Sequence, residues 1–419
     1  MPDPYRGEAH SLQSVQVRSA AFIFVVASFA RAADTSATLV SGDEAEPIHS
    51  AVIRREAWTQ DPVRHLRLDA ERHLKEGPWT VTADRPKGIE LDPHEYYSES
   101  PFYWPDAANP AGPYLRRGGQ INPALFAANR AALDSMCDAV FTLGTAAYLL
   151  DDARYASRAA RIVQTWFILP RTRMDPNMQH AGTSPGGNGG AASVPGGGVS
   201  EGRPLIRAIQ GMEFLAKTGA WDPKEEAATR KWFEEYLRWM APASPATANR
   251  RSGGDNSIWR AALEAAAATF AEDAAAQRGV FDSYRGRAFP RPPRAAGRGA
   301  VNLPAPVLAA SLEARAMICR IAQSHGVDLW SLPARNGGTI ATPIDSLEAS
   351  LADPKQWSKE QAAEFQSNGV YLMAFAGMGL NKPDYIAQFR KLERLESAWL
   401  ALVDLLVGRW EAAAHQTRH

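Results

Sequence analysis

The chain of 419 residues is long enough for one large domain or two ordinary ones, with a well-buried core. Its 46 basic and 46 acidic residues cancel, which excludes a global field that would draw the protein to nucleic acid or to an anionic membrane. The two cysteines, Cys137 and Cys319, are too few for a disulfide scaffold. Both fall on apolar helix-like faces, so we expect free, buried thiols.

An apolar run near the N-terminus, residues 20–30 (AAFIFVVASFA), precedes the small-x-small sequence Ala30-Arg31-Ala32. Crossing a bilayer takes about 20 residues, so the run is too short for a membrane span but matches the core of a signal peptide. We predict a signal peptide over residues 1–32 and a secreted protein, periplasmic if bacterial. The small, polar residues 33–50 predict a flexible lead-in. The alternative for the apolar run is a helix packed on the domain.

The rest of the chain is predicted to be helical. Residues 51–74 mix helical spacing with Pro62 and predict two short helices. Apolar residues then recur at i, i+3 and i+4, which is typical of core-facing helices. This spacing predicts helices over residues 129–148, 152–167, 203–217, 223–240, 256–276, 306–324, 359–378 and 383–410. Helices joined as hairpins without a heptad seam predict one all-α domain over residues 51–412, with an α/α layered or toroidal arrangement.

A ring-rich loop lies within residues 92–122, where no apolar periodicity predicts a regular helix or strand. Flat rings stack on the apolar faces of sugars, and guanidinium groups bind carboxylates in bidentate fashion. The loop therefore predicts binding of an acidic carbohydrate, and the alternative is that its rings pack on the core. The candidate binding residues here are Tyr96, Tyr103, Trp104, Arg116 and Arg117.

The glycine-dense segment 182–202 has neither the preceding strand nor the Gly-Lys-Ser/Thr sequence of a phosphate-binding loop. We expect either a mobile lid over a groove or a surface insertion. The nine histidines lie apart, and neither His-Glu-x-x-His nor Cys-x-x-Cys occurs. We therefore expect no metal ion and no organic cofactor.

Several of these stretches resemble the alginate-lyase-like polysaccharide lyases. The opening signature is similar to YYSESPFYWPD at 96–106 and GPYLRRGGQINP at 112–123. The resemblance continues through RYASRAARIVQTWFILPRTRMDPNMQHA, LIRAIQGMEFL, KWFEEYLRWM and HGVDLW, and covers about residues 88–331. It implies an (α/α) barrel, or incomplete toroid, with a groove at one end. Together with the predicted signal peptide and the balanced charge, it predicts a secreted enzyme that acts on an acidic polysaccharide, without nucleic acid as a partner.

Such enzymes cut a uronate polymer by β-elimination, which removes the proton at C5 and expels the C4 oxygen. The site must neutralise the carboxylate, accept a proton and donate a proton; Asn or Arg suits the first task, and His or Tyr the others. By resemblance, Asn256 is the carboxylate-neutralising asparagine, Trp259 is the aromatic end of that motif, and Arg298 is the arginine of a later loop. Ser257 stands where the family has histidine, and no tyrosine follows Arg298.

Three interpretations follow from these departures. In the first, His180 is the base and Tyr97 or Tyr284 is the acid. Asn177, just before His180, and Trp259 are candidate substrate-binding residues. In the second, the chain is a degenerate lyase that still binds acidic glycan.

The third interpretation is a glycoside hydrolase that uses two carboxylates, such as Asp106 and Glu201. Simpler roles also remain open for two residues, because His180 could hydrogen-bond its own loop and Asn256 could cap a helix. The sequence leaves open the choice between alginate and glucuronan, endo or exo cleavage, and the oligomeric state.

Overall fold

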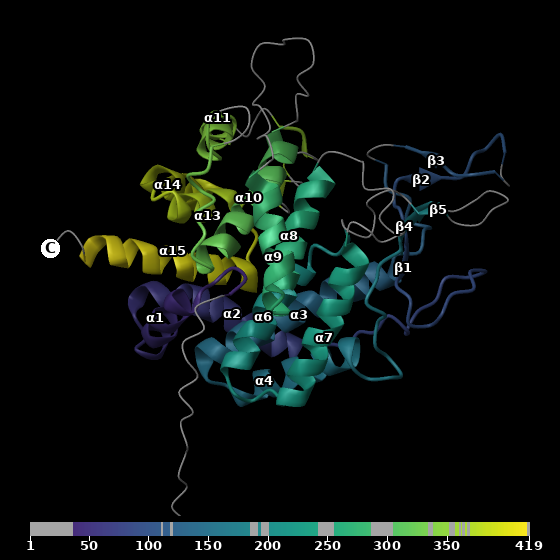
Figure 1. Ribbon diagram of the computed structural model, residues 1–419, viewed down its shortest axis with the longest axis horizontal. Helices are drawn as coiled ribbons and strands as arrows, with labels where there is room; N and C mark the ends of the chain where they lie inside the picture. The colour runs from purple at the N-terminus through teal and green to yellow at the C-terminus, as the bar shows by residue number, and fades with distance from the viewer. Residues whose placement is uncertain are drawn as a thin grey trace, which may run out of the picture. The chain divides into compact units, whose positions relative to one another are not determined.

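The computed structural model of the protein describes residues 37–109, 112–117, 120–184, 192–193, 201–241, 255–285, 305–333, 338–351, 357–359, 362, 365–366 and 369–416. The predicted signal peptide, residues 1–32, lies outside them. Helices dominate the described residues, which confirms the all-α prediction (Figure 1). They are α1 (Gly42–Ile53), η1 (Ala57–Thr59), α2 (Gln60–His73), α3 (Ala128–Leu150), α4 (Ala153–Phe167), α6 (Leu205–Lys217), α7 (Pro223–Met240), α8 (Asp255–Phe270), α9 (Ala274–Arg285), α10 (Ala305–Ser324), α11 (Ala341–Leu351), α13 (Leu372–Gly379), α14 (Pro383–Lys391) and α15 (Ala398–Gln416).

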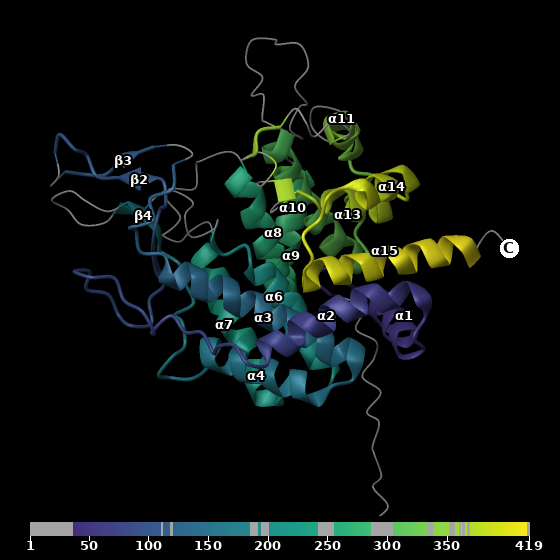
Figure 2. The same ribbon diagram turned by 180° about the vertical axis from the view of Figure 1, so that it is seen from behind.

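The helices form two layers. In one layer α3, α6, α8 and α10 pack each against the next, and in the other α4, α7 and α9 cover them. Helix α15, near the C-terminus, packs against α2, near the start of the domain, so the two ends of the domain meet. Short strands gather on one side of the helices, and α1 and α15 lie on the other (Figures 1 and 2). None of the described helices is long and apolar enough to span a membrane.

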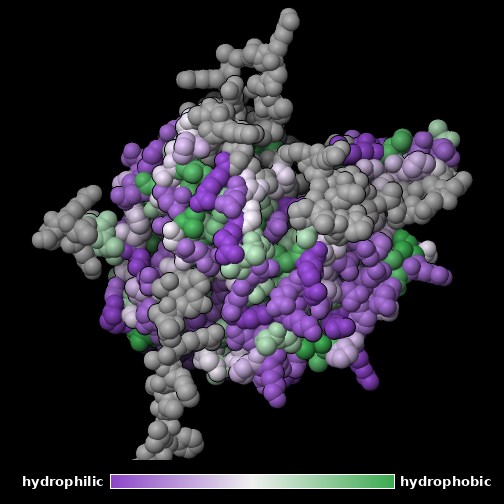
Figure 3. Space-filling view, in the orientation of Figure 1, coloured by the Kyte–Doolittle hydropathy of each residue, from purple (hydrophilic) through white to green (hydrophobic). Residues whose placement is uncertain are grey.

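The core is apolar and continuous, and the surface is mostly hydrophilic. Both Cys137 and Cys319 are free and buried, as predicted. On the face shown in Figure 3, hydrophobic residues form small separate patches among polar ones. The buried rings and aliphatic side chains of the helices therefore account for most of the hydrophobic stabilisation.

Helices α3 and α6 cross unusually closely, because glycines meet at the crossing. A Cβ atom added to Gly211 would lie 2.5 Å from the carbonyl oxygen of Val140, and one added to Gly144 would clash with the backbone of Gly211. Real Cβ atoms essentially never lie so close to backbone atoms. The two glycines therefore let the backbones of α3 and α6 approach each other.

The prediction of one helix over residues 256–276 is wrong beyond Phe270, since α8 ends there and α9 begins at Ala274. Glu272 has a φ of 58°, a left-handed conformation that cannot continue a helix. The Asp273 carboxylate then accepts hydrogen bonds from the N–H groups of Ala275 and Ala276. The predicted helix 383–410 is likewise two helices, α14 and α15.

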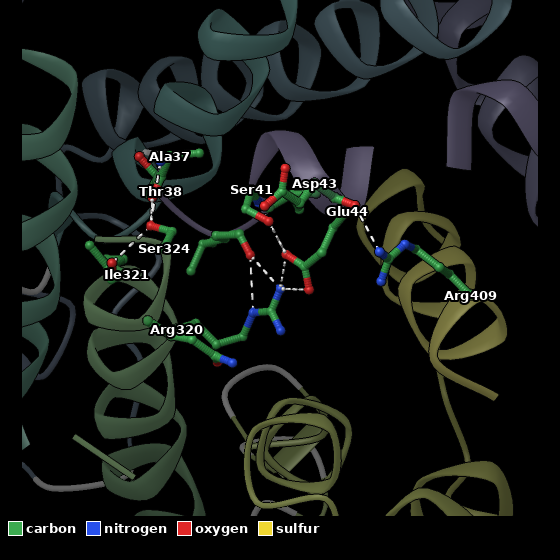
Figure 4. A network of polar contacts seen from close by, with 12 residues as sticks. Ala37, Thr38, Ser41, Asp43, Glu44, Arg320, Ile321, Ser324 and Arg409 are labelled. Atoms are coloured by element: carbon green, nitrogen blue, oxygen red, sulfur yellow. Dashed lines mark hydrogen bonds and ion pairs between the residues drawn. The ribbon is translucent and has the colours of Figure 1, made fainter. Parts of the chain in front are cut away.

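The segment Ala37–Val40, which we call the N-terminal strap, is buried between α6 and α10. Glu213 accepts from a strap N–H at 3.1 Å and from the Thr38 hydroxyl at 2.7 Å. Gln210 accepts from two strap N–H groups at 2.9 Å. On α10, Arg320 donates to a strap carbonyl oxygen at 2.8 Å and the Ser324 hydroxyl donates to another at 2.5 Å (Figure 4).

The strap corrects the prediction of a flexible lead-in over residues 33–50. Its backbone is fixed from Ala37 on, and α1 begins at Gly42, although structure was expected only near Ala51. Glu44 in the first turn of α1 accepts from the Ser41 N–H at 3.0 Å and from Arg320 at 2.8 Å. Side chains of α6 and α10 satisfy the backbone of the strap, and polar contacts of this kind leave no apolar period in the sequence.

Glu213 makes the stability of the domain depend on pH. Burial raises the pKa of its carboxyl to about 7 from an ordinary 4.5, with Thr38 opposing the shift. Because the folded pKa is the higher one, the associated stabilisation is complete below about pH 4.5 and is lost as the pH rises through 7. The shift corresponds to about 3 kcal/mol.

Between pH 4.5 and 8 we expect the free energy of unfolding to fall in both proteins. The fall should be smaller in Glu213→Gln than in the wild type, and the difference should be about 3 kcal/mol. The amide keeps an oxygen that can accept from Thr38 but cannot ionise. Urea denaturation at both pH values measures the difference. The buried carboxyl of Glu313, whose pKa is raised to about 8, contributes a similar slope to both proteins. Parallel pH profiles would contradict the assignment.

Candidate active site

Five short strands within the described residues form the non-helical side of the domain. Strand β1 (Tyr97–Glu99) pairs in parallel with β4 (His180–Ser184), which pairs antiparallel with β5 (Ala192–Ser193). The register runs from Tyr97 opposite His180 to Glu99 opposite Thr183, so β4 holds one extra residue. Gly182 lies in this bulge with a φ of 63°, a conformation that glycine adopts without strain. The predicted lid, residues 182–202, thus begins as a strand, and its central parts lie outside the described residues.

The partly buried carboxylate of Glu201 joins β1 to the helices. The side chains of Tyr96 and Ser98, two residues apart and so on one face of the strand, both donate to Glu201 at 2.6 Å. Arg130 of α3 binds the other oxygen of Glu201, also at 2.6 Å. Glu201 thus accepts hydrogen bonds from three side chains. Because its carboxylate is occupied in this way, the pair of Asp106 and Glu201 does not favour a glycoside hydrolase. The carboxylate of Asp106 accepts from a backbone N–H two residues on, as a turn residue does.

Tyr97 points to the opposite side of β1. Its hydroxyl donates to Glu99 at 3.0 Å, and Glu99 also accepts from the N–H of Phe126 at 2.8 Å. The ring is 1% exposed, and burial raises the pKa of the phenol well above its usual range. Tyr97 therefore fixes the strand to the loop before α3.

His180 begins β4 and remains accessible, with 31% of its side chain exposed. Its Nε2 atom lies 3.7 Å from a carboxylate oxygen of Glu95, whose other oxygen accepts from the Gln179 amide at 3.0 Å. Asn177 accepts from the N–H of Gln179 at 3.3 Å and so shapes the turn that leads into His180. The arrangement presents an imidazole to solvent with a carboxylate beside it.

A two-stranded ribbon follows β1 directly and carries the rings and arginines of the predicted binding loop. Strand β2 (Tyr103–Trp104) pairs antiparallel with β3 (Leu115–Arg116), with Tyr103 opposite Arg116. The guanidinium of Arg117 lies over the Trp104 ring at 5.5 Å, and the indole N–H donates to the Gln120 carbonyl at 3.0 Å. Trp104 is thus held in place while Arg116 and Arg117 stay exposed.

No group of three or more His, Cys, Asp or Glu side chains able to hold a metal ion occurs among the described residues. The polar side chains around β1 and β4 are those of tyrosine, histidine, glutamate and arginine. Such side chains suit proton transfer and the binding of carboxylates.

Comparison with known proteins identifies the family. The alginate lyase family model matches residues 80–301, more than half of the chain. The chain belongs to the alginate lyase family. Its fold is similar to that of an alginate lyase from Bacteroides ovatus, with a TM-score of 0.73, 21% identity, and coverage of 88% of this chain and 98% of that one. Alginate lyase A1-III from Sphingomonas species A1 also matches, with a TM-score of 0.43, 13% identity, and coverage of 71% of this chain and 80% of that one.

No curated protein matches this chain. The family and the fold identify the protein as a polysaccharide lyase and confirm the predicted all-α, incomplete α/α toroid.

In this alginate lyase family protein, four of the aromatic candidate residues are buried. Tyr96 and Tyr97 are each 1% exposed, and Trp259 is 4% exposed beneath the guanidinium of Arg203 at 4.7 Å. The alternative acid, Tyr284, is 3% exposed with its hydroxyl 3.3 Å from the sulfur of Cys319. These four rings therefore pack on the core, and residue type alone does not indicate such burial.

The remaining motif residues are only partly described. Asn256 lies in the first turn of α8, as the resemblance implies, but its side chain falls outside the described residues. Ser257 next to it is half-buried. Arg298 lies outside the described residues altogether. Neither the position of Glu95, which directly precedes the aromatic cluster, nor the fixed position of Glu201 was predicted from the sequence.

Proposed function

We propose that the protein cleaves a 1,4-linked polyuronate, alginate or glucuronan, by β-elimination. The observation that carries this proposal is the partly exposed imidazole of His180, which lies beside Glu95 on a strand paired with β1. The two-stranded ribbon that follows β1 adds the Trp104 ring with the guanidinium of Arg117 over it. A base, a guanidinium group and an aromatic surface are the groups that elimination from a bound uronate requires.

The proposed roles follow from exposure. Tyr103, Trp104 and the exposed Arg116 and Arg117 bind the polymer through its ring faces and carboxylates. Asn177 acts indirectly by shaping the turn before His180.

At the reacting sugar, Asn256 and Arg298 are proposed to neutralise the carboxylate, as the family resemblance implies. His180 accepts the C5 proton, and the Glu95 carboxylate, 3.7 Å from the ring, offsets the charge that forms.

The same histidine supplies the proton donor. Tyr97 and Tyr284 are unsuitable, since both hydroxyls are buried and hydrogen-bonded. The imidazolium formed at His180 can return its proton to the departing C4 oxygen, which balances the reaction without a second residue. This scheme requires the C5 proton and the C4 oxygen to lie on the same face of the sugar ring.

Incubation of the purified protein with alginate, glucuronan and pectate tests the proposal. We expect the ultraviolet absorbance of the unsaturated uronate to rise on alginate or glucuronan and not on pectate. Reducing ends without this absorbance would overturn elimination. Binding without any cleavage would favour the second candidate, a degenerate lyase that binds acidic glycan, which Ser257 at the family's histidine position supports.

Secretion is a further part of the proposal, based on the apolar run at residues 20–30 and the small-x-small sequence at Ala30-Arg31-Ala32. The N-terminal sequence of exported protein is expected to begin near residue 33. Exported protein that begins at Met1 would contradict it.

A further inference from the structure

Two grooves flank helix α2, far from the strands. The first, which we call the arginine groove, has a volume of about 470 Å³ and lies between the end of α1, the first turns of α2 and the end of α3. Its floor is aliphatic, with Val52, Val63 and Leu149, and three arginines lie around it: Arg55, Arg64 and Arg67. No carboxylate is among the lining residues. The volume is in the range of small-ligand sites.

The second groove, of about 780 Å³ between α2 and α15, differs in charge. It is lined by the carboxylates of Asp61, Glu396, Asp404 and Glu411 as well as by arginines. There Arg390 binds Asp404 and Glu411, each at 3.1 Å, so its charge is neutralised within the groove. A polyanion would be repelled by the acids of this second groove and attracted by the arginine groove.

The arginines of the first groove are open to solvent. Arg55, Arg64 and Arg67 are all exposed. Arg64 has an ion pair with Asp61 at 3.3 Å, but both side chains are more than half exposed, and such pairs contribute little. Arg64 and Arg67 are three residues apart on α2, so their side chains lie side by side.

Arg55, which lines the groove, has a left-handed backbone conformation that is strained for a residue other than glycine. Helix α1 ends at Ile53, and Arg55, two residues beyond it, has a φ of 56°. The next N–H, of Glu56, donates back to the Ala51 carbonyl oxygen at 3.0 Å. Glycine is the usual residue at this position, and another residue costs about 1 kcal/mol. Strain of this kind is commonly retained where the side chain has a role.

We propose that the arginine groove is a second binding site for the acidic polysaccharide, separate from the site of cleavage. A polyuronate has one carboxylate per ring, which guanidinium groups bind in bidentate fashion, and apolar C–H faces that suit an aliphatic floor. Helix α3 runs from Arg130, beside β1, to Leu149 in the groove, 19 residues and therefore about 28 Å apart. The identity of the ligand assigned to this groove rests on the proposed function.

Such a site would hold a long polymer near the enzyme without affecting short substrates. We expect Arg55→Gln/Arg64→Gln/Arg67→Gln to raise KM for alginate polymer about tenfold with kcat unchanged, because one of two linked contacts is lost. KM for a trisaccharide should not change. Retardation of the protein in a native gel containing alginate should weaken in parallel, and more strongly at low salt.

The matched control removes three other exposed arginines that do not line the groove, in Arg161→Gln/Arg171→Gln/Arg278→Gln. Equal effects in both variants would mean non-specific charge attraction and would overturn the site. Unchanged polymer KM and retardation in the groove variant, or an equal rise in KM for the trisaccharide, would also overturn it.

The gel also separates the two proposals. Absence of unsaturated product with groove-dependent retardation would reject only the cleavage reaction, whereas a wild-type protein that alginate does not retard would reject the groove.

Discussion

Replacing His180 with glutamine is expected to lower kcat on the polyuronate substrate by about 10²–10⁴-fold, the usual contribution of a general base, with little change in KM. Glutamine keeps a polar group beside Glu95 but cannot accept the C5 proton. The measurement is the initial rate of unsaturated uronate formation over a range of substrate concentrations.

His94→Gln is the matched control for that prediction. His94 is also half-buried on the same side of the domain, but its Nδ1 atom binds the Arg173 carbonyl at 2.6 Å and so serves the loop. We expect its kcat to remain close to that of the wild type. If His180→Gln retained full activity, the base would have to be another residue, and the proposed single-histidine scheme would be wrong.

The second large effect is expected at the crossing of α3 and α6. Gly211→Ala should reduce the free energy of unfolding by about 3 kcal/mol or more, since overpacking against rigid backbone is at the upper end of such substitutions. The added Cβ would lie 2.5 Å from the Val140 carbonyl oxygen, and neither helix backbone can move without disturbing the core. Urea denaturation measures the change.

A second glycine provides the control. Gly279, within α9, has no atom within 4 Å of an added Cβ. Alanine there should be neutral or stabilise the protein by up to about 1 kcal/mol, because it restricts the unfolded chain. A Gly211→Ala protein as stable as Gly279→Ala would show that the close crossing does not constrain the fold.

Helix boundaries were predictable where the chain carries a local signal. The sequence Asp222-Pro223 predicted a helix over 223–240, and α7 is Pro223–Met240, with the Asp222 carboxylate accepting from the Lys224 N–H at 2.7 Å. The break after Phe270 was missed, because the apolar pattern continues across Glu272 while the backbone does not. The strands were missed because they have only two to five residues.

The candidate site was predictable in composition more than in geometry. The rings and arginines do lie together at Trp104 and Arg117. However, adjacent residues of a strand point to opposite sides, so Tyr96 and Tyr97 are buried in different contacts, with Glu201 and Glu99. Glu201 is 105 residues from Tyr96, and no local pattern can indicate such a pairing.

The N-terminal strap also determines the order in which the domain can be completed. Ala37 is hydrogen-bonded to Ser324, which is 287 residues later in the chain. During synthesis the strap therefore lacks its hydrogen-bond partners on α10 until that helix has been made. Contacts of such long sequence separation form slowly, because a large loop must close first. A fragment that ends before Ala305 would lack the partners on α10. The first described residues of the chain are therefore among the last to reach their native place.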